Sequence, residues 1–250
     1  MKYLYYILIA TFLIFTSCED KKKASEVKAK TTSENKTVSK KNSTSEKDTI
    51  SVDSSKIQEK EEVIGAGYPK ITQKNLKDFL TEYGNKNPET KVEISTRLGD
   101  IVIDLYEDTP LHRANFIYLV KQGYFNETFF HRIVPNFIIQ GGNSDLPSTN
   151  KKRFKLGDDY LIPAEINGRN HFKGSVSGAK EYRENPDKKS APFEFFIFLG
   201  PLTSTSHLNG NYTVFGRVTK GMDVVEKIAK LPADEGEWPL QNVYIKAKVL

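Results

Sequence analysis

The sequence predicts a mainly β fold, a closed β-barrel with two helices, for residues 91–250 of a 250-residue chain. Two observations predict it. Short runs in which apolar and polar residues alternate recur along this part of the chain, as they do in half-buried strands. Only two longer segments there have apolar residues at helical spacing. Many strands with few helices favour a sheet that closes on itself.

The first 18 residues have the pattern of a secretory signal. Lys2 precedes an apolar run, Tyr3 to Phe15, which ends at Thr16-Ser17-Cys18. The run is shorter than the about 20 residues that a transmembrane helix needs. Cys18 is the only cysteine, so no intramolecular disulfide can form. Its position resembles the lipobox of bacterial lipoproteins, which implies lipidation of Cys18 and a lipid-anchored, extracytoplasmic protein on a bacterial membrane. An ordinary cleaved signal peptide is the alternative.

Residues 19–60 are predicted to be a disordered tether. They are Lys, Ser, Thr and Glu with few apolar residues, and they contain no aromatic residue, glycine or proline. Such a segment buries too little apolar surface to offset its ordering entropy. Residues 1–60 carry 12 lysines and eight acidic residues, so most of the net charge of +5 lies there. The nearly neutral remainder argues against a nucleic-acid-binding domain.

Residues 61–90 are predicted to be a short helical extension. Apolar residues at helical spacing place a helix over 71–83, with Thr72 as N-cap and Gly84 at its end. A linker follows, and then two alternating runs, 92–96 and 101–105. Leu98-Gly99-Asp100 lies between these runs, so they form a β-hairpin. Thr109-Pro110 starts the next helix, which ends at Gly123.

Residues 125–142 hold a single cation, Arg132, in an apolar and aromatic run. The alternation predicts strand structure that is broken at Pro135-Asn136. Arg132, Ile138 and Gln140 can then share one face. Taken alone, the arginine is more typical of a barrel strand whose cation reaches out to water, since charges near apolar runs are usually solvated.

The rest of the chain completes the predicted sheet. Strands are expected at 193–199, 213–218 and 243–250, and a second helix at 221–230. Residues 151–159 are polar, and 180–191 contain Asn185-Pro186-Asp187 and form a surface loop.

Several separated motifs occur in an order that resembles the cyclophilin-type peptidyl-prolyl cis–trans isomerases. They are the Thr-Pro helix, F-H-R-I-V-P-N-F-I-I-Q-G-G, E-F-F-I, V-F-G-R-V and G-M-D-V-V-E. The resemblance covers residues 91–250. It implies an eight-stranded antiparallel β-barrel capped by two helices, with the active site in a groove on the outer face of the barrel.

The resemblance also implies the roles of individual residues. Arg132 matches the catalytic arginine. Lys180, Glu194 and His207 stand where the family usually has Asn, Gln and Trp, so the resemblance leaves sequence preference open, and His207 implies weak cyclosporin binding. Tyr212 stands where eukaryotic members often have His and similar bacterial members often have Tyr. The implied substrate-binding residues are Phe137, Ile138, Gln140, Ala179, Lys180, Glu194, Phe196, His207, Leu208 and Tyr212.

The chemistry of such a site needs no cofactor, metal or nucleophile. The four histidines show no metal-ligand spacing, and there is no second cysteine. His131 is expected to be a hydrogen-bonded core residue. The implied partners are proline-containing, unfolded or partly folded polypeptides, and a monomer is expected. The predicted function is therefore isomerisation that assists the folding of exported proteins at a membrane surface. The alternative is a proline-peptide binding module or holdase with little or no catalysis.

Overall fold

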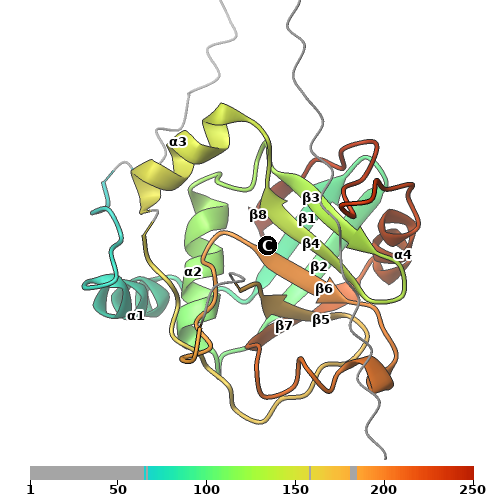
Figure 1. Cartoon of the computed structure of the whole chain (residues 1–250). Coiled ribbons are helices and arrows are strands. Elements are labelled where there is room, and N and C mark those ends of the chain that lie inside the picture. The colour runs from blue at the N-terminus through green and yellow to red at the C-terminus, as the bar shows by residue number, and fades with distance from the viewer. Residues whose placement is uncertain (1–64, 66, 158, 181–184) are drawn as a thin grey trace, which may run out of the picture. The chain divides into compact units, whose positions relative to one another are not determined.

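The computed structural model describes residues 65, 67–157, 159–180 and 185–250 (Figure 1). The predicted signal segment, Cys18 and the predicted tether lie outside these residues. Within the described part of the chain, no helix has the length and apolar character needed to cross a bilayer.

Eight antiparallel strands form one sheet, as predicted. Their order across the sheet is β3-β4-β6-β5-β7-β2-β1-β8, and the sheet curves into a half-barrel. The strands are β1 (Lys91–Thr96), β2 (Gly99–Leu105), β3 (Phe129–Val134), β4 (Ile138–Asn143), β5 (Ser175–Gly178), β6 (Phe195–Phe198), β7 (Val214–Lys220) and β8 (Lys246–Val249).

The prediction of a fully closed barrel is not supported, because the edge strands β3 and β8 do not pair along their length. Among the described residues, the bridge at this edge pairs Phe129 of β3 with Tyr244, which lies two residues before β8. Further along β3, the backbone N–H of Ile133 donates to the carbonyl oxygen of Glu237 at 2.8 Å. The loop before β8 therefore occupies the edge of β3 that a closing strand would need, and the four-residue β8 begins beyond it.

The two helices predicted beside the sheet are present as α2 (Pro110–Lys121) and α4 (Met222–Ala229). α2 is buried along nearly all of its length, since it lies between the sheet and α1. Thr109 precedes α2 as expected but gives no side-chain cap. The carboxylate of Glu165 accepts the N–H groups of Leu111 and His112 instead, each at 2.9 Å. A distant acidic residue thus neutralises the positive end of the helix.

Helix α1 (Leu76–Lys86) begins and ends later than predicted. Thr72 is not its N-cap, because residues 72–75 form turns in which Asn75 N–H and Leu76 N–H donate to the Thr72 carbonyl. Gly84 does not end the helix. A Cβ atom at Gly84 would lie 3.0 Å from the Cβ of Ala114, so this glycine lets α1 approach α2 closely.

Two elements are not predicted by the sequence: helix α3 (Pro147–Leu156) and strand β5. α3 has only two buried residues, Thr149 and Leu156, so it leaves no apolar periodicity to detect. β5 has only four residues, all buried, and Val176 is its only large apolar residue, so the run is too short and too weakly apolar to predict a strand. A short 3₁₀ helix, η1 (Leu202–Ser204), follows β6.

Candidate active site

The predicted strand around Arg132 is a hairpin of two strands, β3 and β4. The chain turns at Pro135-Asn136, where Asn136 has a φ of 58°, so the break was predicted at the right place. The register pairs Arg132 with Gln140 and Val134 with Ile138. β4 in turn pairs with β6, which sets Gln140 opposite Phe196. Three predicted site residues thus lie in one row across three strands, on the outer face of the sheet.

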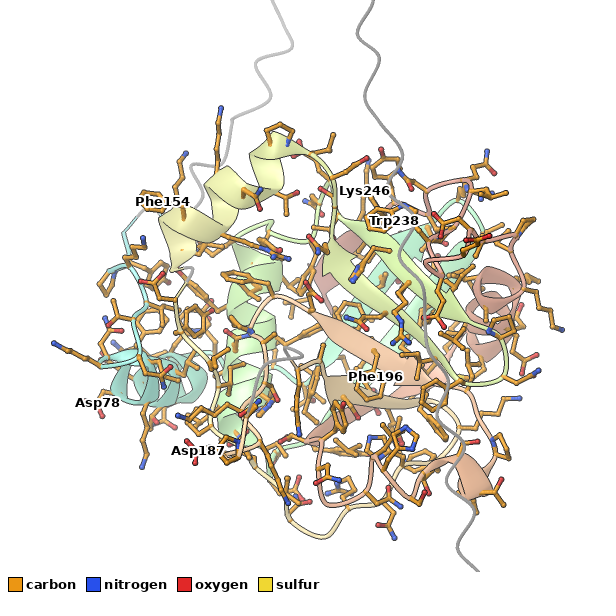
Figure 2. All side chains as sticks on the ribbon, in the orientation of Figure 1. Asp78, Phe154, Asp187, Phe196, Trp238 and Lys246 are labelled. Carbon is orange, nitrogen blue, oxygen red and sulfur yellow. The ribbon has the colours of Figure 1, made fainter. Side chains whose placement is uncertain are left out.

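The outer face carries a pocket of about 620 Å³ beside this row. The chain brings all eleven residues predicted for catalysis and substrate binding to its lining, although they come from four separate segments. Phe196 is labelled in Figure 2 on β6, within this face. The lining consists of His131, Arg132, Phe137, Ile138, Gln140, Ala179, Lys180, Asn185, Glu194, Phe196, His207, Leu208 and Tyr212.

One side of the pocket is apolar and has its own small core. Phe196 is its floor, and the ring of Tyr212 meets it edge-on at 5.6 Å. This cluster is separate from the core on the inner face of the sheet. It consists of Ile138, Phe196, Phe198 and Leu208, with the partly buried Val134, Phe137 and Tyr212 packed against it.

A buried histidine supports the floor from below. The ring of His171 stacks on Phe196 with a centroid distance of 5.9 Å and an interplanar angle of 5°. Its Nδ1 contacts Asn209 Oδ1 at 2.9 Å, and its Nε2 contacts Ser177 Oγ at 3.0 Å. Burial lowers the pKa of His171 below its ordinary value, against the opposing effect of the Asn209 bond. The neutral imidazole is therefore favoured beneath the pocket.

The opposite wall is polar and is organised around Glu194. Its carboxylate accepts from Gln140 Nε2 at 2.9 Å and from the guanidinium of Arg153 at 3.3 Å, and it lies 3.5 Å from His131 Nε2. Burial alone would raise the pKa of Glu194, but His131, Arg153 and Gln140 together lower it below its ordinary value. Glu194 is therefore a charged group whose negative charge is largely neutralised within the wall.

Sequence reasoning missed three residues of this site. Asn185 lines the pocket from the loop that was predicted only as a surface turn. Arg153 reaches Glu194 from α3, a helix whose sequence has no apolar periodicity. His131 also lines the pocket. It is buried and its Nε2 pairs with Glu194, in agreement with the expected core histidine, but its Nδ1 has no hydrogen-bond partner among the described residues.

A bulge in β3 explains why His131 reaches the pocket. Phe130 pairs with Gly141 and Arg132 with Gln140, so two steps along β3 match one step along β4. His131 is the extra residue. A bulge of this kind breaks the strict alternation of side chains, and His131 and Arg132 can both face the pocket. No local sequence pattern indicates this bulge.

Another histidine forms an arrangement like a nucleophile triad, away from the pocket. His112 Nδ1 contacts Glu165 at 2.6 Å, and its Nε2 contacts Ser190 Oγ at 2.9 Å. Ser190 is fully buried, and a Cβ atom at Gly178 would lie 2.5 Å from its hydroxyl oxygen. There is no room for a substrate at that hydroxyl. The three groups instead tie the start of α2 to the neighbouring loops.

The pocket offers a permanent cation at the edge of an apolar, shaped surface. Arg132 is partly buried, with 29% of its side chain exposed. A guanidinium in such a place can donate hydrogen bonds to an amide nitrogen or carbonyl without ever losing its charge. The apolar side can hold a small ring and exclude water.

Known proteins share both the sequence and the fold. The family model for cyclophilin type peptidyl-prolyl cis-trans isomerases matches residues 91–249. A peptidyl-prolyl cis-trans isomerase of Acinetobacter baylyi is 38% identical over 57% of this chain and 73% of its own length. One from Schizosaccharomyces pombe is 35% identical over 62% and 94%. A crystal structure of the Cryptosporidium parvum cyclophilin type isomerase in the presence of the dipeptide Ala-Pro gives a TM-score of 0.53 at 27% identity, covering 64% and 98%.

Proposed function

The chain belongs to the cyclophilin-type peptidyl-prolyl cis–trans isomerase family, and we propose that Arg132 is the residue with which it catalyses rotation about X-Pro bonds. That the chain is an isomerase follows from the family; the roles of the pocket residues are the proposal. The observation that carries it is the row of Arg132, Gln140 and Phe196 across β3, β4 and β6, which sets a cation beside an apolar pocket.

The reaction requires loss of amide resonance, over a barrier of about 18–20 kcal/mol. As the bond twists, the proline nitrogen regains its lone pair and becomes a hydrogen-bond acceptor. Arg132 donates to this nitrogen or to the neighbouring carbonyl, which stabilises the twisted peptide more than the planar one. Phe137, Ile138 and Phe196 hold the proline ring and exclude water, so the hydrogen bond is stronger than it would be in solvent.

Gln140 orients the bound peptide. Its amide nitrogen donates a hydrogen bond to Glu194. The amide oxygen is then an acceptor for a substrate N–H or for Arg132. A rate gain of about 10⁴ to 10⁵ requires the barrier to fall by roughly 5–7 kcal/mol. One charge-assisted hydrogen bond together with a shaped apolar pocket is of that size.

The substrates are proline-containing stretches of unfolded or partly folded polypeptides, bound by a monomeric enzyme. The dipeptide Ala-Pro in the structure of the Cryptosporidium parvum relative supports this substrate class. The dimensions of the pocket agree with it, since a volume of about 620 Å³ accommodates a proline ring and its flanking residues.

Exchange spectroscopy on a proline peptide tests the role of Arg132. The full chain should speed the interconversion of the cis and trans peptide signals, and Arg132→Ala should reduce that catalysis by about 10²- to 10³-fold. The thermal unfolding midpoint serves as the control, because a partly exposed arginine contributes little to stability. Full exchange activity in Arg132→Ala would refute the proposed mechanism. Peptide binding by the wild type without exchange would indicate a binding module or holdase instead.

The site of action is an extracytoplasmic membrane surface, where the enzyme assists the folding of exported proteins. The support is in the sequence: Cys18 directly follows an apolar signal-like run, and a polar stretch separates it from the isomerase region. Partition between detergent and aqueous phases, measured in a bacterial host, tests this. The wild type should enter the detergent phase and Cys18→Ser should not, if lipid on Cys18 is the anchor.

A further inference from the structure

A carboxylate outside the pocket lining holds the arginine of the site. The Nε of Arg132 donates to Oε2 of Glu237 at 2.5 Å, across 105 residues of sequence. A guanidinium has five N–H donors in a planar fork, so a bond at Nε leaves the four on the terminal nitrogens for a substrate. This contact therefore restrains the side chain without consuming the donors that the reaction needs.

The backbone of Glu237 is fixed next to Arg132 by a tight turn. Asp234 Oδ1 accepts the N–H groups of Gly236 and Trp238, each at 2.9 Å. Glu237 N–H donates to the Asp234 carbonyl at 3.0 Å, and the Glu237 carbonyl accepts from Ile133 N–H at 2.8 Å. Since Ile133 directly follows Arg132, a backbone hydrogen bond joins the turn to the strand immediately beside the arginine.

The side chain of Trp238 attaches the turn to the same strand a second time. Its ring lies edge-on to Phe129 at 5.2 Å and tilted against His131 at 6.0 Å. Its indole N–H donates to Asn242 Oδ1 at 3.2 Å. Trp238 is labelled beside β3 in Figure 2. Residues on both sides of Arg132 thus contact the segment that presents Glu237.

The ion pair is poorly explained by stability alone. The side chains of Arg132 and Glu237 are 29% and 40% exposed, and pairs with that exposure contribute little to folding. Glu237 also has a φ of 65°, in the left-handed region that a glutamate adopts only at a cost. A glycine would fit this backbone better but would offer no carboxylate.

We propose that Glu237 is a positioning residue for catalysis, which restricts Arg132 to the side-chain conformation that aims its terminal nitrogens into the pocket. The proposal rests on the catalytic role proposed above for Arg132. An unrestrained arginine samples many rotamers, and each turnover would have to order it again. Glu237 does not touch the substrate; it lowers the cost of reaching the transition state through Arg132.

Three variants of the full chain test the proposal. Glu237→Gly removes the carboxylate and suits the local φ, Glu237→Gln keeps an acceptor without the charge, and Glu235→Gln makes the same charge change on an exposed neighbour. We expect kcat/KM to fall about tenfold in Glu237→Gly and about threefold in Glu237→Gln. Glu235→Gln should keep wild-type activity. The Kd of a proline peptide should change less than about twofold, because the apolar pocket is untouched.

A double-mutant cycle separates positioning from a general effect on the fold. In an Arg132→Ala background, Glu237→Gly should cause no further loss of activity, because there is no arginine left to position. The unfolding midpoint of Glu237→Gly should equal or exceed that of the wild type. Wild-type or increased activity in Glu237→Gly, or an equal loss in the Arg132→Ala background, would overturn the proposal. Retained activity in Arg132→Ala alone would instead refute the role of Arg132.

Discussion

The same three strands, β3, β4 and β6, carry two hydrophobic cores on opposite faces. On the inner face, Ile133, Ile139 and Ile197 are at most 1% exposed and belong to a large core shared with the helices. On the outer face, Ile138, Phe196 and Phe198 form a small cluster with Leu208 that opens into the pocket. Neighbouring residues in the sequence therefore serve different purposes, since side chains alternate across a strand.

The difference between the faces lies in what completes them. The inner core is covered by other parts of this chain, so its apolar side chains are already buried without a ligand. The outer cluster keeps an apolar surface with Arg132 and the Glu194 network at its rim. Concave apolar surface with a few fixed polar groups is what a ligand site requires. The sheet thus separates a core that stabilises the fold from a surface that has the features of a ligand site.

Adjacent isoleucines on β4 offer the largest test of this contrast. Ile139→Ala should lower the free energy of unfolding by about 2–4 kcal/mol, because it leaves a cavity in a closed core. Ile138→Ala should cost less stability, since solvent already reaches the pocket beside it. Its kcat/KM should fall several-fold while that of Ile139→Ala, measured where the variant is folded, stays near wild type. Urea unfolding and a peptide isomerisation assay measure the two effects.

Equal losses of stability in the two variants would contradict the comparison. So would a loss of activity in Ile139→Ala that matches the loss in Ile138→Ala. The pair is closely matched, because the two residues have the same side chain, belong to the same strand and are both nearly inaccessible, at 4% and 0% exposure.

Alternation was enough to predict that Arg132, Ile138 and Gln140 share one face, and motif order was enough for the resemblance that implies Phe196 in the pocket. Both depend on short stretches of sequence, and strand register then fixes which residues meet. The hairpin turn at Pro135-Asn136 was visible for the same reason. Helix α2 was visible from Thr109-Pro110, although its cap comes from Glu165, which no local pattern connects to it.

Apart from α3 and β5, whose sequences carry no clear periodicity, the features that escaped prediction depend on distant contacts or on irregular backbone. Glu237 reaches Arg132 across 105 residues. His131 is turned toward the pocket by a bulge, and bulges are set by pairing with the next strand. The half-barrel stays open because a loop, rather than a strand, lies along β3. Periodicity reports one strand or helix at a time and cannot show these relations.

Acid pH should lower the stability of the protein through His171, which lies beneath the outer face, and this effect should be smaller than that of a core cavity. Burial lowers the pKa of His171 in the folded state, whereas the unfolded chain keeps the ordinary value of 6.5. As the pH falls below about 6.5, the unfolded state takes up a proton that the folded state resists, and stability declines. The decline ends once the pH is below the folded-state pKa. Above pH 7 the histidine is neutral in both states, so it does not change the free energy of unfolding with pH.

The pH dependence of the unfolding midpoint measures this. Between pH 7 and 5 the wild type should lose stability, and His171→Asn should lose less over the same interval, because Asn does not titrate. His207→Asn is the comparison, since the exposed His207 is a smaller cause of the lowered His171 pKa than burial is, and its removal should reduce the decline less than His171→Asn does. Identical pH profiles in wild type and His171→Asn would show that the histidine beneath Phe196 is not the group responsible.

The smallest expected effect concerns selectivity at the rim of the outer face. The ammonium of Lys180 lies 4.5 Å from the centre of the Tyr212 ring, and burial together with the neighbouring Lys188 lowers its pKa. It remains a cation at neutral pH in a wall whose carboxylate, Glu194, is already neutralised. Peptides with an acidic residue near the proline should therefore be preferred over basic ones.

Lys180→Gln should reduce the ratio of kcat/KM for acidic over basic peptides by about two- to threefold, since a partly solvated charge interacts weakly. Added salt should reduce the wild-type ratio in the same direction, because it screens the attraction. Lys188→Gln removes a neighbouring charge that lies outside the pocket lining and donates to the Gly210 carbonyl, so it should change the ratio less than Lys180→Gln does. A ratio that is unchanged in Lys180→Gln would mean that the charge of Lys180 does not contribute to selectivity at the rim of the outer face.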